Sequence, residues 1–351
     1  MKTDTTEKGL EKIIVAHMTS TGWIAGAPTD YERPYAVDLV QLIEFAKATQ
    51  PKLVEPLDLE NDSPTRRSFL ARLQGEITRR GVIDVLRKGV KHQQHHVDLF
   101  YGTPSAGNTT AAERFAANRF SVTRQLRYSL NEEQNALDAG LFVNGLPIAT
   151  FELKNSLTKQ TVADAVEQYK RDRDPRELIF QFGRCIVHLA VDDAEIRFCT
   201  DLKGKTSWFL PFNKGWNDGA GNPPNPAGLK TDYLWKEVLT KESLTNIIEN
   251  YAQIVEEVNK KTGKKKRKQI FPRYHQIDVV KKLLGDAQAH GAGKRYLIEH
   301  SAGSGKSNSI AWLAHQLTSI ARDGKQAFDT IIVVTDRTIL ASQLRETIKQ
   351  S

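Results

Sequence analysis

Residues 137–154 read LDAGLFVNGLPIATFELK. Two apolar runs flank Asn144-Gly145, and an Asn-Gly pair in that setting is a strong signal for a β-hairpin turn. The pattern therefore predicts one strand over Leu137–Val143 and a second over Leu146–Lys154. This hairpin, set among further strand-like and helical segments, decides how the N-terminal part of the chain folds.

Three charged residues lie within the predicted hairpin. Glu152 and Lys154 are two positions apart on one strand, so their side chains point to the same face. Their neighbours are apolar, and charges in such places usually pair or bind a metal. Asp138 lies opposite Phe151 if the turn is a plain two-residue one, and opposite Glu152 if a bulge offsets the ladder by one residue. Pro147 lacks an N–H and makes a disturbed ladder plausible.

The offset register brings two carboxylates and one ammonium together. Asp138 and Glu152 can then hold Mg²⁺ between them. Lys154 can orient an attacking water and offset charge in the transition state. A structural salt bridge from Glu152, to Lys154 or to a helix, is the alternative that these residues alone leave open.

Strand-like and helical segments continue on both sides of the hairpin. One helix is expected over Leu10–Met18, and mixed helical sequence continues from there up to Lys88. Another helix is expected over Val162–Arg171. Further strands are expected at His96–Tyr101, Phe120–Tyr128, Cys185–Val191 and Glu195–Cys199. Strands with interleaved helices over this length predict an α/β domain.

A basic run marks the sharpest boundary in the chain. Residues 260–268 read KKTGKKKRK and follow a predicted amphipathic helix over Leu244–Val258. Because dense like charges repel and stay solvated, we expect a linker over residues 259–270 between an N-terminal unit, 1–258, and a C-terminal unit, 271–351. Contact with DNA phosphates and a nuclear-import signal are the alternative readings.

A glycine-rich loop, AGSGKS at residues 302–307, lies between an apolar strand-like run, Tyr296–Glu299, and a helical pattern, Ser309–Leu317. Glycines let backbone N–H groups close around an anion at a helix N-terminus. Lys306 is expected to reach the β- and γ-phosphates of a nucleotide, and Ser307 to bind Mg²⁺. The residues expected to bind the nucleotide here are Gly303, Ser304, Gly305, Lys306 and Ser307.

The predicted nucleotide-binding unit has few strands. Only Thr330–Thr335 reads as a further buried strand, followed by Asp336-Arg337 and a helical stretch over Thr338–Lys349. A sheet of this class needs several more strands to cover both faces. We therefore expect a truncated P-loop unit with low nucleotide affinity and little hydrolysis.

The composition indicates which cellular compartment and which kind of binding partner to expect for this protein. The net charge of +8 and the pI of about 9.3 favour a polyanionic partner. Two cysteines imply no disulfide framework and favour a reducing, cytoplasmic setting. No apolar run approaches membrane-spanning length, so no membrane partner is expected.

The motifs together resemble the N-terminal part of the restriction (R) subunit of type I restriction endonucleases. The hairpin is similar to the PD-(D/E)xK nuclease core, and the loop and its surroundings are similar to that family's motor. The other similar stretches are residues 119–126, 169–176, 271–276, 298–307 and 333–337.

The resemblance implies a PD-(D/E)xK nuclease-like domain followed by an incomplete RecA-like P-loop motor lobe. It implies that Asp138 and Glu152 are metal ligands, that Lys154 is the catalytic lysine, and that Arg273 and Gln276 contact adenine. It also implies Mg²⁺ and ATP as cofactors, and DNA and the methylation and specificity subunits as partners. In the full subunit, double-strand DNA cleavage is coupled to ATP-dependent translocation.

One departure concerns the helix after the hairpin. Related nucleases often carry Gln four residues before a Tyr in this helix. In this chain the Tyr is Tyr169 and the residue four positions before it is Ala165, so Gln168 is a candidate replacement. Two other functions stay open. One is a non-catalytic, truncated subunit that docks on DNA or a partner, and the other is an unrelated P-loop NTPase, such as a kinase, with structural carboxylates.

Overall fold

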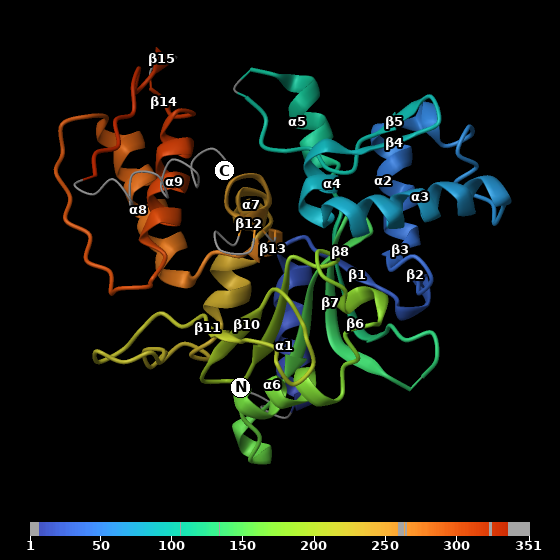
Figure 1. Cartoon of the computed structure of the whole chain (residues 1–351), viewed down its shortest axis with the longest axis horizontal. Helices are drawn as coiled ribbons and strands as arrows, with labels where there is room; N and C mark the ends of the chain where they lie inside the picture. The colour runs from blue at the N-terminus through green and yellow to red at the C-terminus, as the bar shows by residue number, and fades with distance from the viewer. Residues whose placement is uncertain are drawn as a thin grey trace.

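A seven-stranded mixed sheet forms the centre of the computed structural model, which describes residues 7–335 except 106, 133, 259–262, 264, 323 and 324 (Figure 1). The sheet order is β1-β6-β7-β8-β9-β10-β11, with β1–β6 and β8–β9 parallel and the other pairs antiparallel. The strands are β1 (Ile24–Gly26), β6 (Phe120–Arg127), β7 (Ala136–Val143), β8 (Leu146–Leu153), β9 (Val187–Val191), β10 (Ile196–Cys199) and β11 (Leu210–Pro211).

Helices cover the two faces of the sheet with separate apolar clusters. One cluster joins the sheet to α1 and α4, and the other joins it to α6. The helices of this unit are α1 (Glu7–Ser20), α2 (Leu39–Thr49), α3 (Pro64–Arg80), α4 (Val82–Lys88), α5 (Thr109–Ala116), α6 (Val162–Arg171) and α7 (Lys241–Asn246). The predicted α/β class is therefore confirmed.

Several predicted elements have nearly the observed bounds. The helix α6 covers the predicted residues, and β6 to β10 begin and end within two residues of the predicted strands. The predicted strand His96–Tyr101 is wrong in extent, because β5 (His95–Val97) pairs with β4 (Val90–His92) in a separate small hairpin. A second small hairpin joins β2 (Tyr31–Glu32) and β3 (Val37–Asp38).

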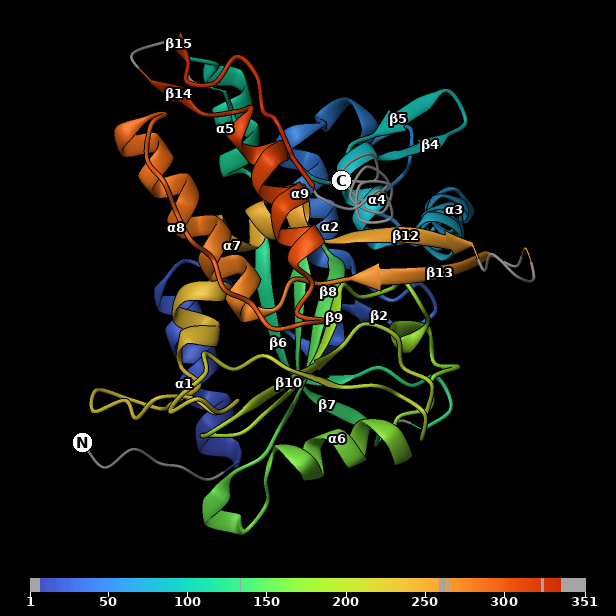
Figure 2. The same ribbon diagram turned by 60° about the vertical axis from the view of Figure 1, so that its left-hand side comes forward.

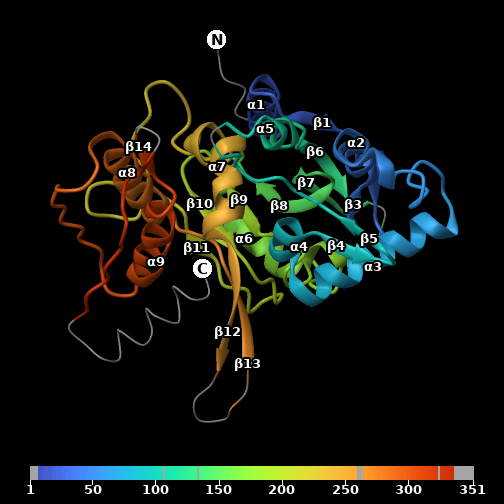
Figure 3. The same cartoon turned by 90° about the horizontal axis from the view of Figure 1, so that it is seen from above.

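The predicted helix Leu244–Val258 and the predicted linker are both corrected. The helix α7 continues as a π-helical turn, Ile247–Tyr251, and the chain then becomes β12 (Gln253–Val258). Six residues of the expected linker form β13 (Lys265–Ile270), antiparallel to β12. The resulting β-ribbon projects from the body (Figure 3). The end of the apolar run becomes strand because β13 supplies its hydrogen bonds, which the sequence periodicity alone could not indicate.

A pair of helices from the C-terminal unit packs against the sheet unit. These are α8 (Tyr274–His290) and α9 (Lys306–Leu317), which lie side by side (Figures 1 and 2). Buried Trp312 of α9 packs against Tyr251, with ring centroids 5.1 Å apart and ring planes tilted by 56°. The ring of Phe271 packs against that of Phe198, with ring centroids 5.5 Å apart. Aromatic side chains therefore join the two predicted units into one core.

The two strands predicted beside the glycine-rich loop are absent from the structure. Residues 296–299 and 330–335 are irregular, and Leu297 and Val334 are 88% and 86% exposed. Neither run has a neighbouring strand among the described residues. The small β14 (Ala321–Arg322) and β15 (Lys325–Gln326) pair only with each other. The predicted Asp336-Arg337 and Thr338–Lys349 lie outside the described residues.

Membrane-spanning helices were not expected, and none of the described helices is both long and apolar enough to cross a bilayer.

Candidate active site

The ladder between β7 and β8 has the offset that the sequence left as one of two possibilities. Phe142 pairs with Pro147, but the adjacent Leu141 pairs with Ala149, so Ile148 is an extra residue on β8. Beyond this bulge Ala139 pairs with Phe151. The next positions along the ladder are Asp138 and Glu152, which therefore lie opposite each other. The missing N–H of Pro147 accounts for the break in the ladder.

The three predicted residues of the hairpin meet at this point. The Asp138 carboxylate reaches across to β8, where its Oδ2 accepts a hydrogen bond of 2.7 Å from the backbone N–H of Leu153. Glu152 and Lys154, on either side of Leu153, are 0% and 7% exposed. Two carboxylates and one ammonium are thus gathered at the end of two adjacent strands.

Arg173, to which the sequence pattern assigned no role, also reaches this cluster. Its Nε donates to Glu152 Oε1 at 2.6 Å, and both side chains are buried. Arg173 lies just after α6, in the run 169–176 that reads YKRDRDPR. Four basic residues occur in that run, and nothing in their spacing indicates which one turns inward.

The surroundings of Glu152 raise the pKa of its carboxyl to near neutral pH. Burial raises its pKa to about 7; the Arg173 guanidinium opposes that shift, Asp138 adds to it and Lys154 opposes it. Glu152 Oε2 has no hydrogen-bond partner among the described residues although it is buried. A buried carboxylate oxygen without a donor suits a cation.

A buried hydrogen-bond network fixes α6 over the cluster. The Tyr169 hydroxyl lies 2.8 Å from Thr150 Oγ1, which in turn lies 2.8 Å from His188 Nδ1. Burial lowers the pKa of His188 to about 3, so this imidazole is neutral. Gln168, the candidate replacement for the missing glutamine, leaves its Oε1 without a hydrogen bond among the described residues. Arg173 contacts Glu152 instead.

Capping residues at both ends of α6 explain where the helix begins and ends. The Thr161 hydroxyl accepts the backbone N–H of Ala163, and the Asp164 carboxylate accepts the backbone N–H of Thr161. This reciprocal cap sets the first turn. Asp172 is the C-cap, so Arg173 lies just past the helix end.

The glycine-rich loop holds its own lysine. Gly303 and Gly305 have φ of 74° and 86°, values that a glycine accommodates without strain, and α9 begins at Lys306. Lys306 Nζ donates to the backbone carbonyls of His300 and Ser301 at 2.7 and 3.0 Å. The ammonium is therefore directed into the loop.

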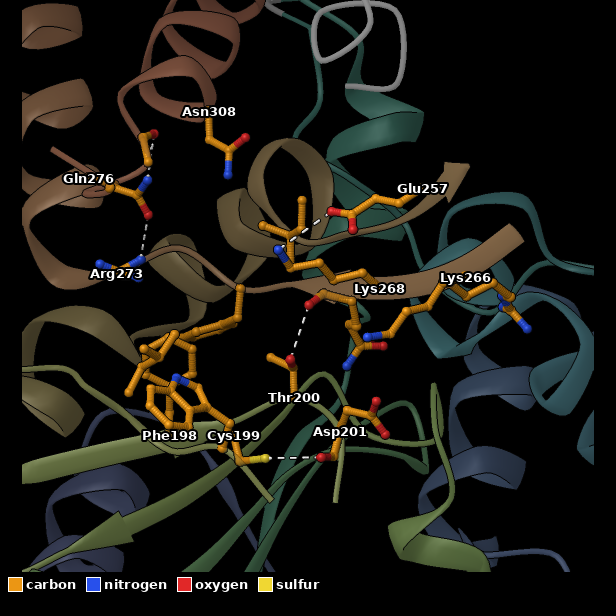
Figure 4. A pocket seen from close by; sticks show the side chains of 18 of the residues that line it. Phe198, Cys199, Thr200, Asp201, Glu257, Lys266, Lys268, Arg273, Gln276 and Asn308 are labelled. Carbon is orange, nitrogen blue, oxygen red and sulfur yellow. Dashed lines mark hydrogen bonds and ion pairs between the residues drawn. The ribbon is translucent and has the colours of Figure 1, made fainter. Parts of the chain in front are cut away.

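The two residues predicted to contact adenine lie next to this loop. Gln276 Nε2 donates to the carbonyl of Gly305 at 2.9 Å, and its Oε1 accepts the backbone N–H of Arg273 at 2.8 Å. Both residues line a cavity of about 450 Å³ together with Gly303, Ser304 and Gly305. The cavity also takes side chains from the sheet unit and the ribbon, including Thr200, Asp201, Lys266 and Lys268 (Figure 4).

Two known families match separate parts of the chain. Residues 4–207 match the family described as Type I restriction enzyme R protein N terminus. Residues 275–351 match the family described as SWI2/SNF2 ATPase. The first match spans more than half of the chain and includes the whole hairpin and Arg173, whereas the second begins beside Arg273 and includes the glycine-rich loop.

Curated relatives are similar over the same region. The chain is 26% identical over 245 residues to the type I restriction enzyme HindI endonuclease subunit of Haemophilus influenzae. It is 24% identical over 237 residues to the putative type I restriction enzyme MjaVIIIP endonuclease subunit of Methanocaldococcus jannaschii. The matches cover 67% and 66% of this chain but 22% and 21% of those proteins. The matched region thus spans about a fifth of the length of these relatives.

Proposed function

The chain belongs to the type I restriction enzyme R protein N-terminus family, and on that basis we propose that its sheet unit carries the nuclease centre of a type I restriction endonuclease R subunit. The proposed reaction is Mg²⁺-dependent hydrolysis of phosphodiester bonds in double-stranded DNA. The observation that supports it best is the meeting of Asp138, Glu152 and Lys154 at the offset part of the hairpin, with Glu152 fully buried.

The donor set fits a hard divalent cation. Mg²⁺ is usually held in proteins by one or two carboxylates, with water and substrate phosphate supplying the other ligands. The described residues contain no cluster of three or more His, Cys, Asp or Glu side chains that could hold a metal. Asp138 and Glu152, which lie opposite each other on β7 and β8, would be the protein ligands. When bound, the ion would polarise the scissile phosphate and lower the pKa of a water.

The side chains would act on the substrate in distinct ways. Lys154 would place its ammonium beside the attacking water and stabilise the charge that develops on the phosphate oxygens. Asp138 is held in place by the backbone N–H of Leu153, which would fix the position of its carboxylate beside the cation. A fixed pair of carboxylates limits the reorganisation that the reaction requires.

A nucleotide site is the second part of the proposal. The loop residues Gly303, Ser304 and Gly305 would donate backbone N–H groups to the phosphates of ATP, and Lys306 and Ser307 would reach the γ-phosphate and Mg²⁺. Lys306 would exchange two loop carbonyls for phosphate oxygens. Gln276 would have to release one of its present hydrogen bonds to contact adenine, with Arg273 beside it. In the full subunit, ATP hydrolysis would drive a RecA-like motor that translocates DNA.

The proposed partners follow from the same assignment. DNA would be held chiefly through phosphates by Lys and Arg, including those of the β-ribbon, so binding would be insensitive to sequence and strongly weakened by salt. Methylation and specificity subunits would choose the site. Tight, sequence-selective binding of DNA by this chain alone, little affected by salt, would contradict this part of the proposal.

The decisive experiment is cleavage of plasmid DNA by the R subunit assembled with methylation and specificity subunits. Glu152→Gln keeps the side-chain volume and removes the charge, so it should abolish cleavage. Glu167→Gln alters an exposed carboxylate on α6 and is the matched control, which should cleave normally. Cleavage by Glu152→Gln at the normal rate would remove Glu152 from the mechanism and leave it only as the ion-pair partner of Arg173. DNA binding by the wild-type assembly without any metal-dependent cleavage would favour the competing candidate, a non-catalytic subunit.

A further inference from the structure

Arg173 joins the ends of three adjacent strands in the sheet. Besides Glu152 on β8, its guanidinium donates to the backbone carbonyl of Ala136 on β7 at 2.9 Å and to the hydroxyl of Tyr128, just past β6, at 3.3 Å. The Arg173 side chain is 6% exposed. Since Ala136 lies two residues before Asp138, the guanidinium sets the separation of the strand ends that carry the two proposed metal ligands.

The guanidinium engages only one oxygen of the Glu152 carboxylate. Arginine often forms two parallel hydrogen bonds to a carboxylate, but here only Nε contacts Glu152, through Oε1. The other two nitrogens are directed to Ala136 and Tyr128. Glu152 Oε2 stays buried and without a hydrogen-bond partner among the described residues. The contact thus fixes the carboxylate while leaving one oxygen open.

From this geometry we propose that Arg173 is the positioning residue of the nuclease centre: it clamps Glu152 Oε1 to the ends of β6 and β7 so that Oε2 is presented to the divalent cation. The inference rests on the proposed nuclease function. It also assigns the supporting role to a residue beyond α6. Ala165 cannot fill that role, and Gln168 leaves its Oε1 without a hydrogen-bond partner among the described residues.

The sign of one measurement separates positioning from a merely electrostatic or structural role. At a pH where Glu152 is ionised with or without Arg173, a fixed positive charge beside a cation site repels the cation, so its removal should tighten metal binding if charge is all that matters. Loss of a group that orients a metal ligand instead weakens binding, commonly by about 10- to 100-fold. Arg173→Met should therefore weaken metal binding if Arg173 positions Glu152, and strengthen it if Arg173 only competes with the ion.

The test is Mn²⁺ binding to the full chain, followed by electron paramagnetic resonance or calorimetry, with folding monitored by circular dichroism. We expect Arg173→Met to weaken binding by about 10-fold or more. Arg173→Lys, which keeps the charge but not the three-way geometry, should fall between Arg173→Met and wild type. Arg176→Met is the matched control, because that guanidinium is 90% exposed and pairs with Asp174; it should bind Mn²⁺ like wild type.

The outcomes distinguish this inference from the function on which it rests. Unchanged or tighter Mn²⁺ binding in both Arg173 variants, with loss of binding in Asp138→Asn and Glu152→Gln, would overturn the positioning role alone. Unchanged binding in Asp138→Asn and Glu152→Gln would overturn the metal centre itself. If Arg173→Met does not fold, Arg173→Lys decides: weaker binding in a folded protein supports the inference, and wild-type binding contradicts it.

Discussion

The hairpin β7–β8 and the segment 295–335 differ most in what surrounds their apolar residues. Every residue of β8 is buried, because β7 and β9 pair with its two edges and apolar clusters cover both faces. Leu297 and Val334 lie in runs just as apolar, yet both are largely exposed and neither is in a strand. An apolar run becomes a strand only where neighbours supply hydrogen bonds and cover.

The difference has a functional counterpart. In the hairpin, each carboxylate accepts a hydrogen bond from a group that folding brings close. Asp138 accepts one from the backbone N–H of Leu153, and Glu152 accepts one from the guanidinium of Arg173. In the loop 302–307, the lysine contacts carbonyls only five and six residues away. The hairpin carboxylates are thus held by groups 15 and 21 residues away in the chain, whereas the loop lysine is held by carbonyls of its own loop region.

The largest expected effect is on cleavage and lies in the hairpin. Lys154→Met should reduce the rate of DNA cleavage by the assembled enzyme by on the order of 10²–10⁴-fold, a range typical of removing a group that assists the attacking water. DNA affinity should hardly change, since one buried ammonium contributes little to phosphate contacts. Lys159→Met, an exposed lysine close by in the chain, is the control. Equal cleavage by the two variants would remove Lys154 from the mechanism.

A second prediction measures how firmly the C-terminal unit is joined to the sheet unit. Trp312→Ala should lower the free energy of unfolding by about 3–5 kcal/mol, because it deletes a fully buried side chain packed against Tyr251. Leu297→Ala should change it by less than about 0.5 kcal/mol, because that side chain is exposed. Urea denaturation measures both. Comparable losses of unfolding free energy in the two variants would mean that Leu297 is as well packed as Trp312, against the contrast drawn above.

A third prediction uses the titration of Glu152. The pKa is raised from 4.5 in the ordinary carboxyl to about 7 in the folded protein, mainly by burial. The folded chain therefore binds this proton more tightly than the unfolded chain, and its stability should fall as pH rises from about 4.5 to about 7. Metal binding needs the carboxylate, so Mg²⁺-dependent cleavage should rise over the same range.

The control for this pH dependence is Glu152→Gln, which cannot titrate at that position. Its stability should lose the component of the pH dependence that lies between about 4.5 and 7. Thermal unfolding of wild type and variant across that range measures the difference. Parallel curves would show that Glu152 titrates normally in the folded protein.

The smallest expected effect concerns the loop. DNA-stimulated ATP hydrolysis by the 351-residue chain should be slow. Phosphoryl transfer depends on precise positioning, and the described residues that flank the loop directly, 296–301, form no strand that could hold it. Lys306→Ala should therefore change little. Robust turnover that disappears in Lys306→Ala would instead reveal a complete motor, formed by this chain or assembled in trans, and would erase the contrast between the two regions.

Local signals in the sequence determined many of the elements. The hairpin turn follows from Asn144-Gly145, and α6 has its predicted bounds because Thr161 and Asp164 cap it. The shared face of Glu152 and Lys154 follows from the period of a strand. These features depend on residues within a few positions of one another, so a linear pattern carries them.

The tertiary structure alone decided the rest. The sequence allowed two registers for Asp138, and pairing with β8 selected the one that faces Glu152. It predicted helix up to Val258, and the contact with β13 made that end a strand. Among four basic residues after Tyr169, folding buried Arg173 against Glu152. Each outcome depends on atoms brought together from distant parts of the chain, whose hydrogen bonds and desolvation exist only once the sheet has formed.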